Sequence, residues 1–412
     1  MNHLFYSQRA TWDRLRSGPL GPHIEGFAVH LSEQGYAADT GRWKLRLVAK
    51  FSTWLEKRQL SINDVEEEQI AAFLKTQKKH VLLRGSIRPT LMQVLQHLRR
   101  CGILSSRVPA ANPNPLEQIV LNYGKFLSDQ RGLSQVTINN YSPIAQRFLE
   151  NRFGTGKVCL QDLSVCDISR FIVGYSPTAW PGGTQQTATV LRSFFGFLLQ
   201  DGKITHNLAA SVPAVASYRL TKLPMYLEPA QVEKLLNSCD RNSQIGRRDY
   251  AVLLLLARLG LRSGEIVHLN LENINWLAGE LLIRGKSVRE ERLPLLPEVG
   301  QALAEHLKKC RRVGSCRRVF LRMRAPYVGF SSSVSICDIF KRALTRARLQ
   351  PASKGPQLLR RSLATKMLRA GASLAQIGEV LRHQLAQTTE IYAKVDVAAL
   401  RALAQPWPGG AR

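Results

Sequence analysis

Residues able to perform phosphoryl transfer gather near the C-terminus: Arg262, Lys286, Arg360, His383 and Tyr392. A tyrosine phenol can attack a phosphodiester and hold the cleaved end as a phosphotyrosine, which splits one transfer into two steps. Its pKa is about 10, so nearby cations are needed to favour the ionised phenol. Two planar guanidiniums suit the negative charge that spreads over phosphate oxygens in the transition state. A lysine can protonate the departing oxygen, and a histidine can donate a hydrogen bond.

The local sequence around each residue makes this set more specific. Arg262 ends the run Gly-Leu-Arg and precedes Ser-Gly-Glu, and His383 and Tyr392 flank a Thr-Thr pair. The intervals are 24 residues from Arg262 to Lys286, 23 from Arg360 to His383 and nine from His383 to Tyr392. Any one of these residues alone is more often a solvated charge or a structural side chain. The interpretation therefore depends on their joint order and spacing.

This pattern resembles the catalytic domain of tyrosine recombinases, the phage integrase family. The resemblance implies that Arg262 and Arg360 hold the scissile phosphate and that Lys286 is the general acid. It also implies that His383 hydrogen-bonds a phosphate oxygen and that Tyr392 is the nucleophile. Such a set requires no metal ion, and no other cofactor is expected.

Two positions depart from the family pattern. Gln357 stands three residues before Arg360, where the family usually has the histidine of its H-x-x-R motif. A glutamine can hold a phosphate oxygen or orient Tyr392, but it cannot take the phenolic proton as a base. Arg382 stands where the family usually has a glycine, directly before His383. We include Gln357 among the expected site residues.

The composition favours a nucleic-acid partner. Lys and Arg total 58 against 30 acidic residues in 412, a formal net charge of +28. Such an excess favours a polyanion, with double-stranded DNA preferred and a membrane surface as the alternative. No apolar run reaches the roughly 18 residues of a spanning helix, and no signal peptide is indicated. The seven scattered cysteines match no zinc spacing, and reduced thiols in the cytoplasm are expected.

The elements that must position these residues are predicted to be mostly helical. Apolar periodicity predicts a buried helix before Arg262, a helix carrying Arg360 and a helix leading to His383. Two short strands, around residues 281–283 and 292–296, are predicted to form a hairpin with Lys286 near its turn. The predicted helices of this region cover residues 228–237, 248–259, 299–310, 332–347, 357–370 and 374–381.

The N-terminal half contains an internal duplication. Leu31 and the three residues after it match Leu127 and its followers at an offset of 96, and later matches drift to an offset of 100 at Leu98 and Leu198. Each copy is predicted to form about four helices. The alternative is that the repeat reflects only the common spacing of amphipathic helices.

Three domains follow from the repeat and from proline-rich joints around residues 109–115 and 211–224. The resemblance implies a helical core-binding (SAM-like) domain before the catalytic domain, and residues 115–212 occupy that place. Residues 1–108 are expected to be a duplicate of it, and residues 222–405 the catalytic domain.

The leading hypothesis is a site-specific DNA recombinase or integrase of a mobile genetic element that forms a 3′-phosphotyrosine. It is expected in the cytoplasm, associated with the nucleoid, as a homotetramer or a hetero-tetramer with related recombinases on DNA. A type IB topoisomerase-like enzyme is one alternative. The other is a degenerate recombinase that binds DNA without cutting it, which Gln357 favours.

Overall fold

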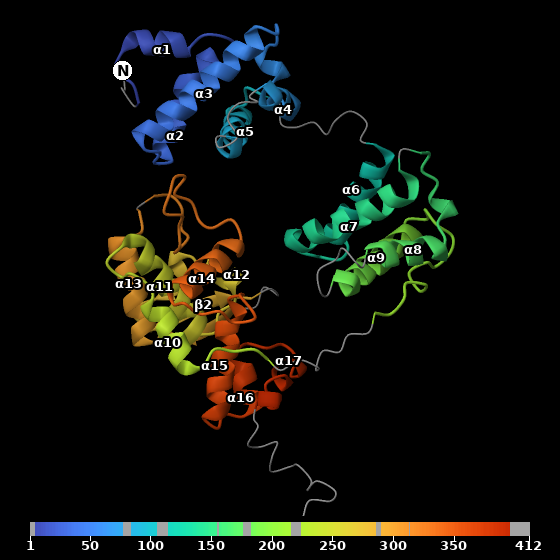
Figure 1. Cartoon of the computed structure of the whole chain (residues 1–412), viewed down its shortest axis with the longest axis vertical. Coiled ribbons are helices and arrows are strands. Elements are labelled where there is room, and N and C mark those ends of the chain that lie inside the picture. The colour runs from blue at the N-terminus through green and yellow to red at the C-terminus, as the bar shows by residue number, and fades with distance from the viewer. Residues whose placement is uncertain are drawn as a thin grey trace, which may run out of the picture. The chain divides into compact units, whose positions relative to one another are not determined.

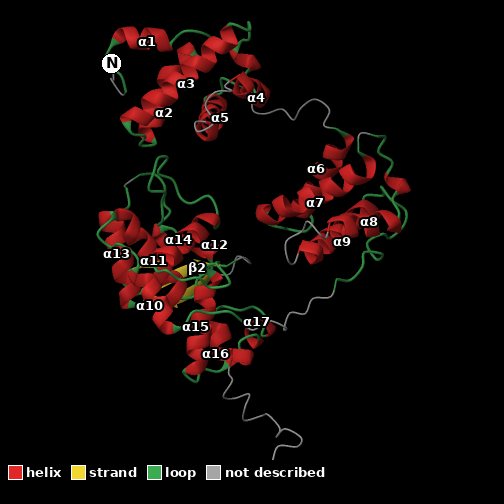
Figure 2. Ribbon diagram, viewed as in Figure 1, coloured by secondary structure: helices red, strands yellow, loops and turns green. Residues whose placement is uncertain are grey.

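The protein is mostly helical, with one small antiparallel sheet (Figures 1 and 2). A computed structural model describes residues 5–76, 84–104, 114–154, 156–175, 183–215, 224–285, 290–312 and 314–395. The predicted fold class is therefore confirmed. No helix in these ranges is both long and apolar enough to cross a membrane.

The chain divides into two compact units, one of residues 1–104 and 222–412 and the other of residues 105–221. The first unit contains separate hydrophobic cores, because the buried side chains of residues 5–104 cluster apart from those of residues 227–392. The domain boundaries at 108, 115, 212 and 222 lie in or near segments outside the described residues, and they stay predictions.

The N-terminal module packs around Phe27, Leu31, Phe51 and Leu95, which are 1% exposed or less. One short helix precedes the predicted set of four. The elements are α1 (Arg9–Leu15), η1 (Gly21–His23), α2 (Ile24–Glu33), α3 (Ala38–Glu56), η2 (Ile62–Asp64), α4 (Glu67–Thr76) and α5 (Arg84–Arg100).

The second module repeats this order. Side chains of Asn114 and Ser134 cap its first two helices by accepting backbone hydrogen bonds from Leu116 and Thr137. Its elements are α6 (Pro115–Asp129), α7 (Gln135–Phe153), η3 (Leu160–Asp162), α8 (Val165–Tyr175) and α9 (Gly183–Gln200).

The internal packing of the two modules matches. Helices α3 and α7 are both 19 residues long. In the first module Phe51 packs edge-on against Phe73, with ring centroids 5.1 Å apart, and Phe148 and Phe171 form the equivalent pair at 5.3 Å. Repeated helix lengths do not require a repeated aromatic contact, so the packing supports a true duplication.

The C-terminal region is built around one buried helix, α11 (Gln244–Arg258), whose residues Ala251–Ala257 are all buried. A run that is apolar on every side is expected for a helix surrounded by other elements. Helices α13 (Pro297–Lys309) and α15 (Gln357–Arg369) contact it directly. The surrounding helical elements are α10 (Pro229–Asn237), α12 (Ser263–His268), η5 (Leu271–Asn273), α13 (Pro297–Lys309) and α14 (Val334–Arg346).

The predicted hairpin forms the larger part of a three-stranded sheet in the order β1-β2-β3. Strand β2 (Glu280–Arg284) pairs antiparallel with β3 (Glu290–Pro294), in a register that sets Ile283 opposite Glu291. Strand β1 (Ile274–Asn275) was not predicted, because two residues are too few for a visible alternation.

The C-terminal helices enclose a smaller core of Ala364, Ile377, Leu381 and Tyr392. A short hydrophobic cluster of this kind fixes the last elements of the chain against one another. These elements are α15 (Gln357–Arg369), α16 (Leu374–Val380), α17 (Gln387–Glu390) and η6 (Ala393–Val395).

Candidate active site

Arg262 is fixed at the start of α12 by the glutamate three residues after it. The Arg262 backbone N–H donates to Glu265 Oε2 at 2.8 Å, and its guanidinium Nη1 donates to Glu265 Oε1 at 2.8 Å. The side chain of Arg262 remains 38% exposed, whereas that of Glu265 is 5% exposed. The glutamate therefore aims a guanidinium that solvent, or a ligand, can still reach.

Arg360 lies one turn into α15 and is 7% exposed. Its Nη1 donates to the Gly260 carbonyl and its Nη2 to the Leu381 carbonyl. Burial lowers the pKa of Arg360 to about 10, and the charges of Arg262 and Arg382 add to the effect. The guanidinium still carries its charge at neutral pH.

A single turn holds both guanidiniums. Leu381 O accepts from Arg360, and the next carbonyl, Arg382 O, accepts from Arg262 Nη2 at 3.1 Å. Arg382 has a φ of +55°, in the left-handed region that favours glycine. A side chain there costs about 1–2 kcal/mol, which explains why glycine is usual in the family pattern.

His383 follows this turn and lies beside Tyr392. Their rings are nearly parallel, with centroids 6.4 Å apart and planes 6° apart. Nδ1 of His383 hydrogen-bonds Thr389 Oγ1 at 2.7 Å. Burial lowers the pKa of His383 to about 4, reinforced by the charges of Arg360, Arg262 and Arg382. The imidazole is therefore neutral at physiological pH.

Tyr392 is 3% exposed, and burial raises the pKa of its phenol. The positive charges of Arg360 and Arg361 act against that increase. The predicted nucleophile therefore lies inside the protein near the cations that would favour its phenolate.

The two other predicted site residues are Gln357 and Lys286. Gln357 is exposed at the first position of α15, one turn before Arg360. Lys286 lies in the connection between β2 and β3, outside the described residues. The structure thus brings Arg262, Arg360, His383 and Tyr392 together, with Gln357 close in sequence to one of them.

Three further residues shape this site without having been given a role from the sequence: Glu265, Arg382 and Thr389. The signal for Glu265 was available, because a carboxylate three residues after a helix start is the spacing of a capping box. Thr389 belongs to the Thr-Thr pair, but its contact with His383 depends on the fold of α17. The side-chain partners of Arg382 come from distant segments and leave no local signal.

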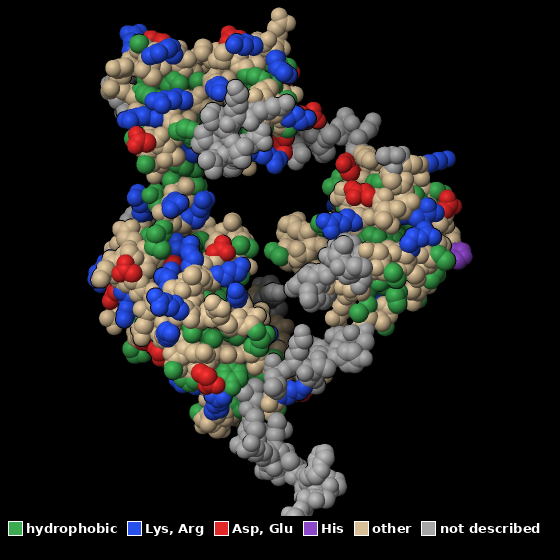
Figure 3. All heavy atoms as spheres, viewed as in Figure 1, with side chains coloured by type: hydrophobic (Ala, Val, Ile, Leu, Met, Phe, Trp, Pro, Cys, Tyr) green, Lys and Arg blue, Asp and Glu red, His purple; other side chains and the backbone are tan. Residues whose placement is uncertain are grey.

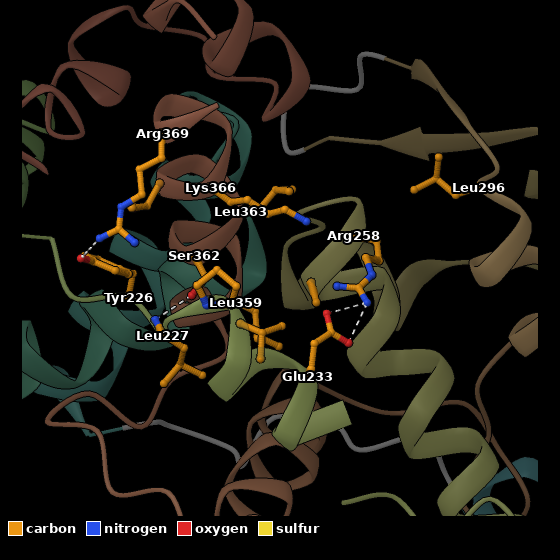
Figure 4. Close-up of a pocket in the computed structure, with 14 residues that line it drawn as sticks. Tyr226, Leu227, Glu233, Arg258, Leu296, Leu359, Ser362, Leu363, Lys366 and Arg369 are labelled. Carbon is orange, nitrogen blue, oxygen red and sulfur yellow. Dashed lines mark hydrogen bonds and ion pairs between the residues drawn. The ribbon is translucent and has the colours of Figure 1, made fainter. Parts of the chain in front are cut away.

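A separate pocket of about 220 Å³ lies away from these residues, between α10, α11 and α15. Arg258 forms an ion pair with Glu233 at its edge, and Arg369 donates to the Tyr226 hydroxyl (Figure 4). None of the predicted catalytic residues lines it. Within the described ranges, no cluster of three or more His, Cys, Asp or Glu side chains is arranged to hold a metal ion.

Comparison with known proteins identifies the family to which this chain is similar. The model of the phage integrase family matches residues 225–398. "Putative integrase/recombinase y4rA" of Sinorhizobium fredii is 40% identical over 396 residues, covering 96% of each chain. The chain belongs to the phage integrase family. The prediction of a tyrosine-type site-specific DNA recombinase is confirmed by this membership.

Further similarities cover about 70% of the chain. Tyrosine recombinase XerD of Listeria monocytogenes is 28% identical over 303 residues, covering 69% of this chain and 97% of its own length. The structure of XerH site-specific recombinase bound to its difH substrate has a TM-score of 0.57 at 19% identity, covering 72% of this chain and 98% of that chain. A lambda integrase dimer bound to a core site has a TM-score of 0.52 at 17% identity, covering 71% and 97%. These structural likenesses support the fold.

Proposed function

We propose that this recombinase cuts and rejoins double-stranded DNA through Tyr392. The phenolic oxygen would bond to the scissile phosphorus as the bond to the 5′ oxygen breaks, leaving a 3′-phosphotyrosine. Lys286 would give the departing 5′ oxygen its proton. Attack by the 5′ hydroxyl of a second strand would reverse these steps and release Tyr392, so the bond energy is conserved.

One observation carries this proposal. The carbonyls of Leu381 and Arg382 accept hydrogen bonds from the guanidiniums of Arg360 and Arg262, so two cations from distant helices are held beside the same turn. Fixed cations stabilise charge that develops on phosphate oxygens because they need no rearrangement during the reaction. If Thr389 donates to Nδ1 of His383, then Nε2 carries the proton and can donate to the same phosphate.

The partner would be double-stranded DNA, bound by a homotetramer or a hetero-tetramer with related recombinases in the cytoplasm, at the nucleoid. The net charge of +28 supports a polyanionic partner. Lys and Arg side chains are spread over the visible face of the catalytic region, with fewer Asp and Glu (Figure 3). A structural neighbour with a TM-score of 0.51 is described as a lambda integrase tetramer bound to a Holliday junction. The similarity to a protein named integrase/recombinase favours a mobile genetic element as the host of the gene.

The test uses a suicide substrate nicked beside the cleavage point and built from the DNA that flanks the gene. Wild-type protein should form an adduct that survives denaturation and should exchange strands. Tyr392→Phe should bind the same DNA with similar affinity but form no adduct, because the attacking oxygen is absent. An adduct with Tyr392→Phe would contradict the assignment. Relaxation of supercoiled plasmid without exchange would favour a topoisomerase, and binding without either would favour a DNA-binding protein.

A further inference from the structure

Arg382 is unusual in both its backbone and its side chain. Its φ of +55° is a conformation in which a Cβ is unfavourable. Its side chain is nevertheless only 4% exposed, less than that of Arg262 at 38%. A long cation buried at a strained position needs partners that compensate for both costs.

Those partners come from two other elements. Arg382 Nη2 donates to Glu265 Oε2 at 2.7 Å, and Arg382 Nε lies 3.2 Å from Glu291 Oε2. Glu265 is the same carboxylate that holds the guanidinium of Arg262 through its other oxygen. Glu291 belongs to β3, so one side chain links the turn before His383 to α12 and to the sheet.

The backbone of the same residue completes the arrangement. Arg382 O accepts from Arg262, and the preceding Leu381 O accepts from Arg360. The two carbonyls can hold these guanidiniums only while the left-handed turn keeps its place. The side chain of Arg382 is the part of this turn that is anchored by ion pairs on both sides.

We propose that Arg382 is a positioning residue for the two catalytic arginines, an inference that rests on the proposed function. Its guanidinium fixes the turn of residues 381–383 between Glu265 and Glu291, and the turn then sets the positions of Arg262 and Arg360. Arg382 touches neither DNA nor Tyr392 in this role. It acts through the hydrogen bonds that the other two arginines make to the turn.

The test is single-turnover cleavage of the suicide substrate at saturating DNA, with affinity measured separately. Arg382→Met keeps the length of the side chain but removes both ion pairs, so the cleavage rate should fall by about 10–100-fold, as expected for a misplaced catalytic group. The Kd for DNA should stay within about threefold of the wild type. Arg382→Lys keeps the charge but loses the bidentate geometry, so its cleavage rate should lie between those of the wild type and Arg382→Met.

A double-mutant cycle separates positioning from general damage. If Arg382 acts through Arg262, adding Arg382→Met to Arg262→Lys should slow cleavage far less than it does in the wild type. Arg258→Met is the matched control, since Arg258 also pairs with two glutamates outside the site, with Glu233 (Figure 4) and with Glu298. Arg258→Met should slow cleavage only slightly. The factor by which it lowers the rate should multiply with the factor for Arg262→Lys.

Glu291→Gln protects the test against misfolding, because the Glu291 side chain is 44% exposed and its loss leaves the Arg382–Glu265 pair in place. It should slow cleavage less than Arg382→Met and show the same non-additivity with Arg262→Lys. Wild-type rates in both Glu291→Gln and Arg382→Met would overturn the inference, as would losses that multiply with Arg262→Lys. A wild-type protein that forms no adduct would overturn the proposed function itself, and the inference with it.

Discussion

The proposed nucleophile, Tyr392, and Gln357, which stands where the family usually has a histidine, have opposite environments. Tyr392 is 3% exposed and burial raises its pKa, whereas Gln357 is exposed at the start of α15. The free protein therefore holds a neutral phenol, and Gln357 has no group that can accept its proton. Burial raises the pKa of Tyr392, and the charges of Arg360 and Arg361 oppose that increase and so favour ionisation.

Replacing Gln357 by histidine tests whether a proton acceptor at this position assists the ionisation of Tyr392. An imidazole at this position supplies a proton acceptor with a pKa of about 6.5. We expect single-turnover cleavage by Gln357→His to equal or exceed the wild-type rate and to rise with pH through that pKa. Gln357→Asn is the control, because it keeps an amide that cannot titrate. A rate and pH profile like those of wild type in Gln357→His would exclude position 357 from the proton path.

At the scale of elements, the site depends on the connection between α11 and α12. Gly260 has a φ of +58°, and its carbonyl accepts from Arg360. A Cβ at Gly260 would lie 2.7 Å from a methyl carbon of Leu381 and 3.2 Å from one of Leu363. The close approach of this loop to the 381–383 turn therefore requires glycine.

Gly260→Ala should consequently impair both stability and cleavage. Backbone strain of this kind costs about 1–3 kcal/mol, and displacement of the Gly260 carbonyl should slow single-turnover cleavage by about 10-fold or more. Gly279→Ala is the matched control, with a φ of +62° and nothing within 4 Å of the added Cβ. It should lower thermal stability through strain alone and leave cleavage unchanged. Equal cleavage losses in both variants would contradict this account.

Elements and residues differ in how far the sequence could predict them. The buried helix before Arg262 and the hairpin were predictable because a long apolar run and alternating strands are local patterns. The predicted start of α11 was four residues too late. Ser243 caps the helix ahead of a polar first turn, which does not show the apolar periodicity of the rest. The left-handed turn at Arg382 was not predictable, because arginine is an uncommon residue there and its partners come from α12 and β3.

At the scale of the whole molecule, the extra helical module is the part whose role is least defined by the catalytic chemistry. If residues 1–108 bind DNA, deleting them should flatten the dependence of log affinity on log salt. Every DNA phosphate that the shortened protein no longer neutralises should reduce that slope by about 0.9. Filter-binding titrations at several salt concentrations, on intact and shortened protein, measure it. An unchanged slope and affinity would identify the module as a protein-interaction domain.

The folded protein should also lose stability in mild acid. His306 is 1% exposed, donates from Nε2 to the Val319 carbonyl, and has a pKa lowered by burial to about 4. Because the unfolded chain binds this proton near pH 6.5 and the folded chain does not, stability is fully present above pH 6.5 and falls as the pH drops toward 4. The difference corresponds to about 3 kcal/mol.

The check is thermal unfolding of the full chain between pH 4 and 7. His306→Gln keeps a hydrogen-bond donor but cannot titrate, so its unfolding temperature should depend less on pH than that of the wild type. An identical pH dependence in both proteins would show that His306 is not the group responsible.

The proposed duplication of the helical module has a consequence for the history of this gene. The offset between the copies grows from 96 at Leu31 and Leu127 to 100 at Leu98 and Leu198, while α3 and α7 keep equal lengths. The segments between matching helices therefore differ in length between the copies, whereas α3 and α7 do not. A doubled segment survives in this form when each copy brings all the side chains of its own core. Such a block can be gained or lost by an ancestor in one genetic event, leaving the catalytic machinery behind it unchanged.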